Sequence, residues 1–365
     1  MAGAKTLLLI DGNNLFHRAY HALPPLTDKS GENANAVFGF SNMILKAISE
    51  VNPDYIACAF DTQAPTFRHV EFEAYKAQRV APPPDLYPQL PKVKAVLDAF
   101  GIKYFEKEGF EADDLLATIA TKVLAFSLGN SRGRDQRSVV SLHKARRNQN
   151  SEIAPLRATS LGKSVQIVIL SGDRDLLQLV DGNIKVQAPS FAKASDGKPG
   201  WGVLMGSKEV REKFGLTPEQ MVDYKSLTGD PSDNVPGVSG IGPKTASQLL
   251  QRYHTLENLY GHLDEISETT REKLEKGREL ALAAKKLVKL DTNVDLGVEI
   301  NNLKYEPDME KVVAQFGELG FKSIVSKIRG TKGKDGPSSF AKASEDKKEP
   351  EVEKTTRNSG QLELI

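Results

Sequence analysis

The sequence predicts an α/β protein whose core is a mostly parallel sheet with helices on both faces, followed by a helical region. Three apolar runs, Thr6–Ile10, Tyr55–Phe60 and Val165–Leu170, have the continuous hydrophobic character of strands that are buried on both faces. From Ser207 onward the apolar residues recur at helical spacing instead. We therefore expect a first part built on a sheet and a second part built from helices.

The remaining elements follow from the same patterns. Apolar residues at helical spacing predict helices over Ala36–Val51 and Leu90–Phe100. Lys103–Phe105 is expected to form a short strand, and 256–290 to hold further helical segments. Beyond about Gly330 the sequence consists mainly of Lys, Gly, Ser, Glu and Pro, a composition that is typical of disorder.

Size and composition restrict the class of protein. With 365 residues, of which 39% are hydrophobic and 27% charged, the chain can bury one large core or two modest ones. No apolar run approaches the ~20 residues of a membrane span. The first ten residues lead directly into a polar motif, which indicates a first strand rather than a signal peptide. A single cysteine, Cys58, excludes an internal disulfide and favours a cytoplasmic protein.

Carboxylates follow the three long strands. Asp11 comes directly after the first strand, Asp61 after the second, and Asp173 and Asp175 after the third. Open α/β sheets build their sites at the carboxyl ends of strands, where these residues are expected to lie. A single aspartate after a strand is also a common turn residue. The Asp-x-Asp spacing of the third pair is a common arrangement of metal ligands, and it also occurs in phosphatase-like folds with an aspartyl nucleophile.

Two further acidic groups favour a metal site over that phosphatase alternative. Glu111, Asp113 and Asp114 crowd the start of a predicted helix, where a single acid would suffice for capping. Their mutual repulsion indicates a cation among them. Asp230 and Asp233 lie three residues apart, an arrangement that suits a divalent metal. The net charge of +1 agrees with this interpretation, because acids gathered on metal leave the remaining surface basic.

A glycine-rich turn and a basic segment point to nucleic acid. Gly237–Lys244 is rich in glycine and opens a helix, which suits the phosphates of a backbone. The stretch 66–79 is basic with interleaved aromatic residues and precedes Pro82–Pro84. It is expected to form a mobile clamp with basic side chains facing phosphates, and the alternative is a solvated helix face. A chain that holds metal and a strand side by side is expected to cut that strand.

Together these motifs resemble the bacterial 5′ nuclease family, which comprises the 5′–3′ exonuclease domain of DNA polymerase I and its stand-alone relatives, kin to flap endonucleases. The resemblance spans about residues 5–325. The motifs are Asp11-Gly-Asn-Asn, Phe60-Asp61, Phe67-Arg-His, Tyr75-Lys, Glu111-Ala-Asp-Asp, Asp173-Arg-Asp-Leu and Thr228-Gly-Asp-Pro-Ser-Asp-Asn-Val-Pro-Gly.

The resemblance implies a PIN-like sheet core and a helix-three-turn-helix. The expected domains are a nuclease core over 1–206, a helical DNA-binding region over 207–328 and a disordered tail over 329–365. Two segments, about 127–164 and 190–200, are insertions relative to the family. Residues 128–163 carry eight basic and two acidic residues, hence a net charge of +6. They would add phosphate contacts or form a tolerated surface loop, and we favour the loop.

The implied activity is a two-metal-ion 5′–3′ exonuclease and flap endonuclease, acting on 5′ flaps, nicks and RNA primers in DNA replication and repair. The implied ions are two or more Mg²⁺, with Mn²⁺ as the alternative, and K⁺ at the glycine-rich turn. The metal ligands carried over by position are Asp11, Asp61, Glu111, Asp113, Asp114, Asp173, Asp175, Asp230 and Asp233.

Basic and turn residues complete the implied site. Arg18, Lys76 and Arg79 fall where the family places basic groups near the scissile phosphate, so they are the expected catalytic cations. The residues expected to contact DNA are Arg68, Tyr75, Gly237, Gly240, Ile241, Gly242, Lys244 and Thr245.

The last residues resemble the short peptide by which bacterial replication proteins bind the sliding clamp. The expected contacts are Gln361, Leu362, Leu364 and Ile365, with Ile365 in place of an aromatic residue, and the alternative is a chance match. The expected partners are branched or nicked duplex DNA, RNA primer–DNA junctions, the clamp and a separate polymerase for gap filling. A monomer in the cytoplasm, associated with the nucleoid, is expected.

Two other functions remain open at this point. A junction-binding clamp partner without catalytic activity would show no cleavage with or without Mg²⁺. A PIN-type ribonuclease would prefer single-stranded RNA to a DNA flap. The complete set of acids argues against the first, and the turn suited to duplex backbone argues against the second.

Overall fold

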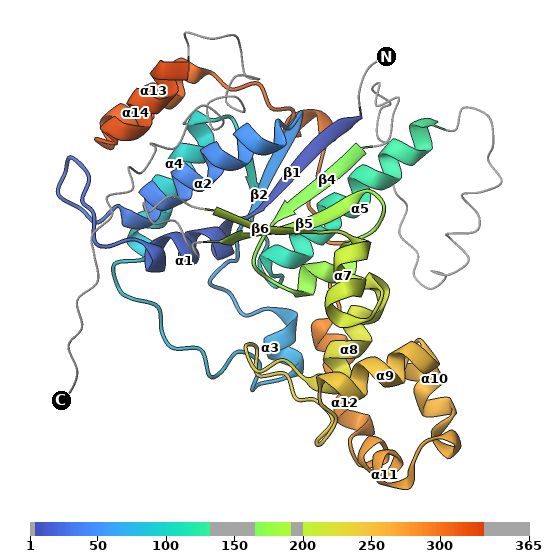
Figure 1. Ribbon diagram of the computed structural model, residues 1–365. Helices are drawn as coiled ribbons and strands as arrows, with labels where there is room; N and C mark the ends of the chain where they lie inside the picture. The colour runs from blue at the N-terminus through green and yellow to red at the C-terminus, as the bar shows by residue number, and fades with distance from the viewer. Residues whose placement is uncertain (1–3, 132–164, 191–199, 332–365) are drawn as a thin grey trace, which may run out of the picture.

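The computed structural model of the protein describes residues 4–131, 165–190 and 200–331. Most of the two predicted insertions, and nearly all of the predicted tail with its clamp-binding peptide, lie outside these residues. In Figure 1 a sheet flanked by helices occupies the upper part of the molecule, and a group of helices projects below it. None of the helices in the described residues is both long enough and apolar enough to cross a membrane.

The predicted mostly parallel sheet is confirmed. Its six strands lie in the order β3-β2-β1-β4-β5-β6. Neighbouring strands from β3 to β5 pair in parallel, and β6 is antiparallel to β5. The strands are β1 (Lys5–Asp11), β2 (Tyr55–Ala59), β3 (Lys103–Phe105), β4 (Val165–Leu170), β5 (Ile184–Ser190) and β6 (Gly200–Met205).

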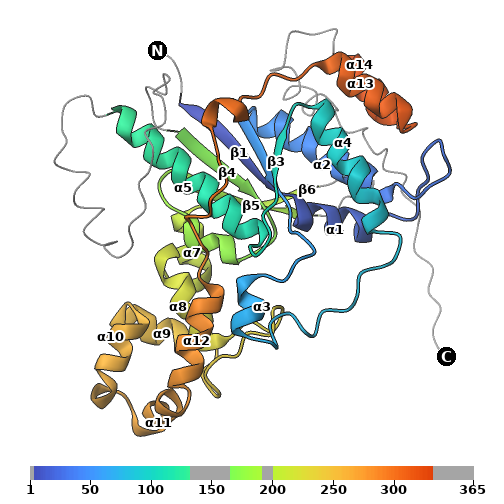
Figure 2. The ribbon, with the colours of Figure 1, turned by 180° about the vertical axis from the view of Figure 1, so that it is seen from behind.

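Helices cover both faces of the sheet, as predicted. In β1, Leu8 and Ile10 face the cluster that includes α1, α2 and α4, because side chains alternate along a strand. Leu7 and Leu9 face the cluster built on α5. Figure 2 shows α5 on one side of the sheet and α2 and α4 on the other. These helices are α1 (Gly12–Ala22), α2 (Asn35–Val51), α4 (Leu90–Ala99) and α5 (Ala112–Ser131).

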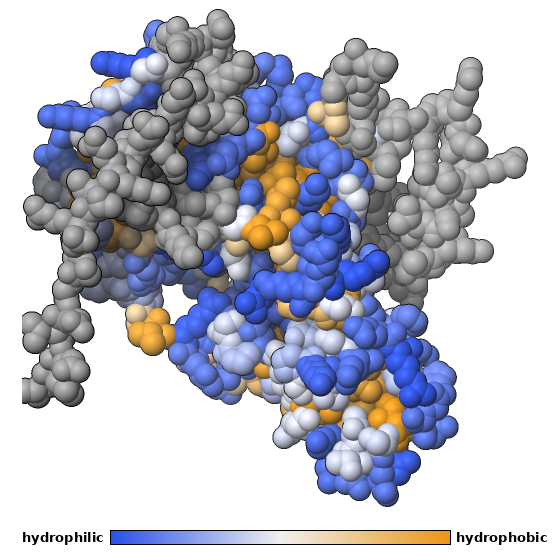
Figure 3. All heavy atoms as spheres, in the orientation of Figure 1, coloured by the Kyte–Doolittle hydropathy of each residue, from blue (hydrophilic) through white to orange (hydrophobic). Residues whose placement is uncertain are grey.

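The projecting helical part has a core of its own. Leu227, Ile241, Leu250 and Leu274 belong to one buried cluster formed by its helices and loops. In the view of Figure 3 most of its surface is hydrophilic, with smaller apolar areas between. Its helices are α7 (Ser207–Phe214), α8 (Met221–Thr228), α9 (Pro243–Tyr253), α10 (Leu256–Gly261), α11 (Glu268–Lys276) and α12 (Arg278–Val288).

The chain returns to the sheet after α12, which differs from the expectation of one helical region over 207–328. Helices α13 (Met309–Glu318) and α14 (Lys322–Thr331) pack on the side of α2 and α4. Val312 and Phe316 of α13 and Ile324 of α14 are buried in the cluster of the sheet domain. Helical spacing therefore identified the secondary structure but not the core in which these helices are buried.

The remaining elements are short. The helix α3 (Phe67–Glu71) lies between the sheet and the helical part. The 3₁₀ helices are Tyr87–Gln89, Asp175–Leu179, Pro218–Gln220, Leu263–Glu265 and Ile300–Leu303.

Candidate active site

The carboxyl ends of β1 and β4 hold the first acids of the site. Asp11 caps α1, where its Oδ1 accepts a hydrogen bond from the Asn14 amide at 2.9 Å. The Ser171 hydroxyl donates to Asp11 Oδ2 at 2.5 Å, and Ser171 Oγ in turn accepts from the Asp173 amide at 3.0 Å. Since β1 and β4 are adjacent and parallel, their ends place Asp11 and Asp173 at one edge of the sheet.

The end of β2 is tied to the start of α5. Asp61 Oδ1 accepts from the Ala112 amide at 2.7 Å, and Asp61 Oδ2 accepts from the Asn13 side chain at 2.7 Å. The first bond fixes the entry of α5, and therefore Asp113, next to the strand end. Four predicted ligands, from β1, β2, β4 and α5, thus gather at the same edge.

These carboxylates repel one another. Burial, with the charges of Asp61 and Asp173, raises the pKa of Asp11 to about 7. The pKa of Asp113 is raised well above its ordinary value by burial and then by the charges of Asp173, Asp11, Asp175 and Asp61. A group of acids whose charged forms are disfavoured in this way is stable at neutral pH only with cations or bound protons.

Lys225 on α8 supplies one such cation. Its ammonium pairs with Asp175 and lies 2.6 Å from Asp230 Oδ2. Burial raises the pKa of Asp175 to about 7 even with Lys225 beside it. Burial acts in the same direction on Asp230, but Lys225 and the Ser232 hydroxyl outweigh it and lower the pKa of Asp230 to about 2. No sequence motif identified Lys225, since a lysine on a helix is ordinarily a surface residue.

Lys76 and Arg79 supply two more cations to the predicted metal ligands. Lys76 Nζ lies 2.7 Å from Glu111 Oε1 and 3.8 Å from Asp233 Oδ2. Arg79 Nη2 lies 2.6 Å from Asp233 Oδ1. The structure therefore brings two predicted catalytic cations onto two predicted metal ligands, one from the sheet domain and one from the helical part.

The third predicted catalytic cation, Arg18, belongs to α1, and its side chain reaches the end of β4. Its Nη1 donates to the Pro189 carbonyl at 2.9 Å. Its guanidinium covers Gly172, where an added Cβ would lie 2.3 Å from Arg18 Nη2. Gly172 precedes Asp173, so Arg18 is beside the acidic cluster.

Arg68 and Tyr75 differ from the expectation that they contact DNA. The Arg68 side chain is 2% exposed and bonds both oxygens of Asp114. Tyr75 is also buried, and its hydroxyl donates to Glu111 Oε2 at 3.1 Å. In the basic stretch 66–79 these two side chains face inward, because Arg68 pairs with Asp114 and Tyr75 donates to Glu111.

Asp114, another predicted metal ligand, forms a buried ion pair with Arg68. Its Oδ2 accepts from Arg68 at 2.7 Å, and its Oδ1 accepts from Arg68 at 2.8 Å and from the Asp291 amide at 2.8 Å. It is fully buried. In this arrangement Asp114 neutralises an arginine, and it has no oxygen turned toward the acidic cluster without a partner.

The glycine-rich turn has the backbone that its sequence demands. Gly240 has φ +76°, a conformation that glycine adopts readily, and Gly242 caps α9 ahead of Pro243 at its first position. Lys244 is exposed and Thr245 half-buried. Ile241 is buried in the helical core, so only its backbone is available to a strand.

The donor set fits a hard divalent cation, because every predicted ligand offers carboxylate oxygens. As placed, no group of three or more His, Cys, Asp or Glu residues within the described residues is arranged to hold a metal ion. Lys225 and Lys76 instead each bridge two of the acids, and Arg79 pairs with Asp233. The chemistry of the site thus suits metal, and lysine and arginine provide the positive charge in this arrangement.

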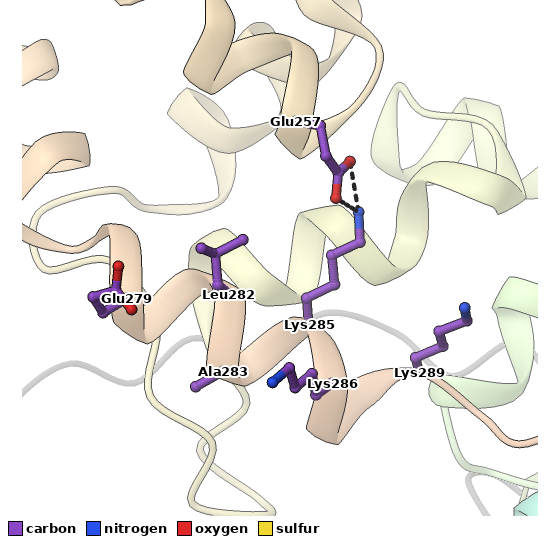
Figure 4. A pocket seen from close by; sticks show the side chains of 7 residues that line it. All are labelled: Glu257, Glu279, Leu282, Ala283, Lys285, Lys286 and Lys289. Carbon is purple, nitrogen blue, oxygen red and sulfur yellow. Dashed lines mark hydrogen bonds and ion pairs between the residues drawn. The ribbon is translucent and has the colours of Figure 1, made fainter.

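A pocket of about 510 Å³ lies between α10 and α12 and contains none of the predicted site residues. Figure 4 shows Lys285 directed at Glu257 across it, at 2.7 Å. The acidic cluster at the sheet edge is therefore the candidate active site.

Two family models match the chain. The model of the 5′–3′ exonuclease N-terminal resolvase-like domain matches residues 6–131, and that of the 5′–3′ exonuclease C-terminal SAM fold matches residues 216–311.

Curated relatives match over most of this chain. DNA polymerase I of Caldicellulosiruptor bescii is 36% identical over 325 residues, which cover 88% of this chain and 33% of that protein. DNA polymerase I of Bacillus caldotenax is 38% identical over 326 residues, which cover 89% of this chain and 32% of that protein. The chain spans about a third of the length of these relatives.

Solved structures share the fold. The T5 D15 protein co-crystallised with metal ions gives a TM-score of 0.56 at 16% identity, covering 89% of this chain and 97% of that one. The T5 D15 flap endonuclease in a pseudo-enzyme-product complex with DNA and metal ions gives a TM-score of 0.55 at 16% identity. This match covers 93% of this chain and 100% of that one. Both describe the arrangement of elements seen here.

Proposed function

The chain belongs to the 5′–3′ exonuclease family, and we propose that it is a structure-specific 5′–3′ nuclease that hydrolyses DNA phosphodiesters at 5′ flaps, nicks and RNA primers. The relatives that carry this match are named DNA polymerase I, and a structural neighbour is named a flap endonuclease bound to DNA and metal ions. We assign the activity to DNA replication and repair on the same ground.

One observation carries the proposal. Acids from the ends of three adjacent strands and from the start of α5 share one edge of the sheet, and burial together with their mutual repulsion raises the pKa of Asp113 and Asp11. Without bound cations, the repulsion among these aspartates costs folding free energy. Divalent cations bound among them would offset that cost.

Mg²⁺ is the proposed ion, with Mn²⁺ as the alternative, because the ligands are all carboxylates. Two such ions would supply Lewis acidity, which would activate a water and stabilise the leaving oxygen of an in-line displacement. Asp11, Asp61, Asp113, Asp173 and Asp175 would hold them from the sheet side, and Asp230 from the helical side. Asp114 stays on Arg68.

The chain's own cations bind and orient the phosphate. Lys76 and Arg79 reach the acids from the segment after α3 and can exchange their carboxylate partners for the scissile phosphate. Arg18 lies against Gly172, next to Asp173. The turn from Gly237 to Lys244 offers backbone amides to the duplex, with K⁺ as the proposed ion there.

The remaining proposals concern partners and place. Residues Gln361–Ile365 are proposed to bind a sliding clamp, because their pattern of Gln and apolar residues resembles the clamp peptide. A pull-down in which deletion of 361–365 leaves clamp retention unchanged would dispose of this idea. Gap filling after cleavage requires a DNA polymerase activity, which we propose as the functional partner of this monomeric, cytoplasmic nuclease.

The test is Asp173→Asn in a 5′-flap cleavage assay with and without Mg²⁺. We expect the single-turnover rate to fall more than about a hundredfold, since even groups that only orient a metal ligand cost 10- to 100-fold. Affinity for the flap is expected to change little. Asp98→Asn, on the exposed side of α4, is the matched control and should cleave normally.

Each alternative gives a different result in the same assay. Flap binding without any cleavage by the wild type would indicate a junction-binding partner. Faster cleavage of single-stranded RNA than of the DNA flap would indicate a ribonuclease. Full activity of Asp173→Asn with Mg²⁺ would remove the metal-site assignment.

A further inference from the structure

The loop between α8 and α9 is hydrogen-bonded to the segment that follows α3. Asn234 in this loop donates from its Nδ2 to the Ala74 carbonyl at 2.7 Å, and its Oδ1 accepts from Gln78 Nε2 at 2.7 Å. Next to it, the Lys76 amide donates to the Asp233 carbonyl at 2.9 Å. One residue of the helical part thus binds both ends of the turn 74–78.

This contact lies directly beside the acidic site. Asp233, which precedes Asn234, receives Arg79 at 2.6 Å. Lys76 has φ +55° and Asn234 has φ +56°, both in the left-handed region. A lysine in that conformation is uncommon, and it is held here by its contacts. The positions of the Lys76 and Arg79 side chains therefore depend on the grip of the loop on this turn.

The segment is held again farther along, at Asp85. This carboxylate accepts from the Tyr20 hydroxyl at 2.7 Å and from the Asn33 side chain at 2.7 Å. Leu86 is fully buried in the sheet domain. Between the two anchors the residues are mostly exposed, and Val80 is 92% exposed. The stretch from Ala77 to Pro84 is thus a strap whose orientation is set by its two ends.

The anchor at Asn234 is not supported by dense packing on all sides. An open groove of about 460 Å³ separates the turn from the loop, lined by Phe72 and Gln78 on one side and by Thr228 and Pro231 on the other. On the inner side, Tyr75 and Val235 share a small buried cluster. Beside this groove, the two hydrogen bonds of the Asn234 amide join the turn to the loop, next to the backbone bond from Lys76 to Asp233.

We propose that Asn234 is a positioning residue that holds the strap so that Lys76 and Arg79 point into the acidic site. The inference rests on the proposed nuclease function for its kinetic consequence. Its structural consequence, the anchoring of the strap, is independent of that function. Asn234 touches no predicted metal ligand with its side chain and acts only through the turn 74–78.

Two roles of Asn234 need to be separated. Asparagine tolerates the left-handed backbone, so its conformation alone is a reason for it to be present. Asn234→Gly keeps that conformation available and removes the amide. Asn234→Ala removes both. Gln78→Ala removes one of the two bonds from an exposed side chain, where folding is not at risk.

The first measurement is limited trypsin digestion of the metal-free, DNA-free protein. Cleavage after Lys76 and Arg79 should be about tenfold faster in Asn234→Ala and Asn234→Gly, and about threefold faster in Gln78→Ala, because the turn is released. Asn258→Ala is the matched control, since it also removes an asparagine bond to a backbone carbonyl, that of Tyr253 at 2.7 Å. It should leave both rates unchanged.

The second measurement separates kcat from KM on a 5′-flap substrate. In Asn234→Gly we expect kcat to fall about three- to tenfold, the equivalent of one or two hydrogen bonds, while KM changes less than twofold. The turn at Gly237–Lys244 is intact in this variant, so binding of the duplex persists.

The outcomes divide cleanly. Faster trypsin cleavage at the strap together with the kcat loss supports the proposal. Unchanged cleavage at Lys76 and Arg79, a general increase at all sites, or faster cleavage with unchanged kcat overturns it. If the wild type does not cleave flaps, the proposed function fails, and the trypsin pattern still decides whether Asn234 anchors the strap.

Discussion

The Arg68 guanidinium forms two parallel hydrogen bonds with Asp114, from Nη1 at 2.7 Å and from Nη2 at 2.8 Å, in the interior of the protein. Arg68 Nε also donates to the Leu287 carbonyl at 2.7 Å, and Nη2 to the Lys289 carbonyl at 3.2 Å. One side chain therefore joins α3, the start of α5 and the end of α12, which are far apart in the sequence.

Arg68→Met should destabilise the protein by about 3–5 kcal/mol, because it leaves Asp114 buried and unpaired. Urea unfolding measures the change. Arg252→Met is the matched control, since Arg252 pairs with Glu265 at 2.8 Å with 61% of its side chain exposed. Its loss should cost at most about 1 kcal/mol. Equal losses for the two variants would contradict a structural role for the buried pair.

Asp113→Asn should stabilise the metal-free protein at pH 8, on the order of 1 kcal/mol. The pKa of Asp113 is raised in the folded state, so ionising it costs folding free energy as pH rises. Thermal unfolding in chelator measures the gain, with Asp98→Asn as the control. Addition of Mg²⁺ should then stabilise the wild type more than the variant. A destabilised Asp113→Asn in chelator would argue against mutual repulsion in the cluster.

The sheet and the strand-end acids could be predicted because both leave local signals. Continuous apolar runs indicate strands buried on both faces, and the parallel order places their ends together. That is sufficient to bring Asp11, Asp61 and Asp173 to one edge. Helical spacing from Ser207 onward predicted the helical part, and the acids at 111–114 marked the start of α5.

The rest depends on contacts between distant segments, which no local pattern encodes. Arg68 and Lys76 lie in the same basic stretch, yet one is buried on Asp114 and the other reaches Glu111. Lys225 becomes part of the site only because α8 packs beside the 3₁₀ helix at Asp175. The burial of α13 and α14 against α2 and α4 follows from the path of the whole chain.

Gly237→Ala should be far more destabilising than Gly242→Ala. A Cβ on Gly237 would lie 2.3 Å from the Gly229 amide nitrogen, so backbone has to move, whereas a Cβ on Gly242 meets no atom within 4 Å. We expect a loss of about 2 kcal/mol or more for the first and under about 1 kcal/mol for the second. Thermal unfolding of both variants is the check, and similar losses would show that the loop at Gly229 and Gly237 yields easily.

Lys92→Met should make the free energy of unfolding fall less steeply as the pH is lowered from 4 to 2. Burial would raise the pKa of Asp28, but hydrogen bonds from Lys92 and Ser30 outweigh it and lower the pKa to about 2. The folded pKa is below the unfolded one, so this stabilisation is present above about pH 4 and is lost as pH falls toward 2.

Urea unfolding from pH 6 to pH 2 measures this profile. The loss between pH 4 and pH 2 should be smaller in Lys92→Met than in the wild type, by up to about 1 kcal/mol. Lys304→Met, which removes an exposed pair with Glu306 at 2.5 Å, is the control. A profile of Lys92→Met identical to that of the wild type would refute the assignment to Asp28.

Lys225→Met tests whether lysine and divalent metal serve the same electrostatic need. Among the described residues Lys225 is the cation that pairs with both Asp175 and Asp230, and both carboxylates are largely buried, at 13% and 14% exposure. In chelator the variant should lose about 3 kcal/mol of stability. Mg²⁺ should restore more stability to the variant than it adds to the wild type, because the vacated position suits an ion bound by oxygens.

Lys285→Met is the matched control for this test. Lys285 also pairs with two acids, Asp223 at 2.6 Å and Glu257 at 2.7 Å, but neither belongs to the acidic cluster. The control should lose stability in chelator and gain no more from Mg²⁺ than the wild type does. An equal response of the two variants to Mg²⁺ would mean that Lys225 is an ordinary buried ion pair, and that the ions act at Asp11 and Asp113 alone.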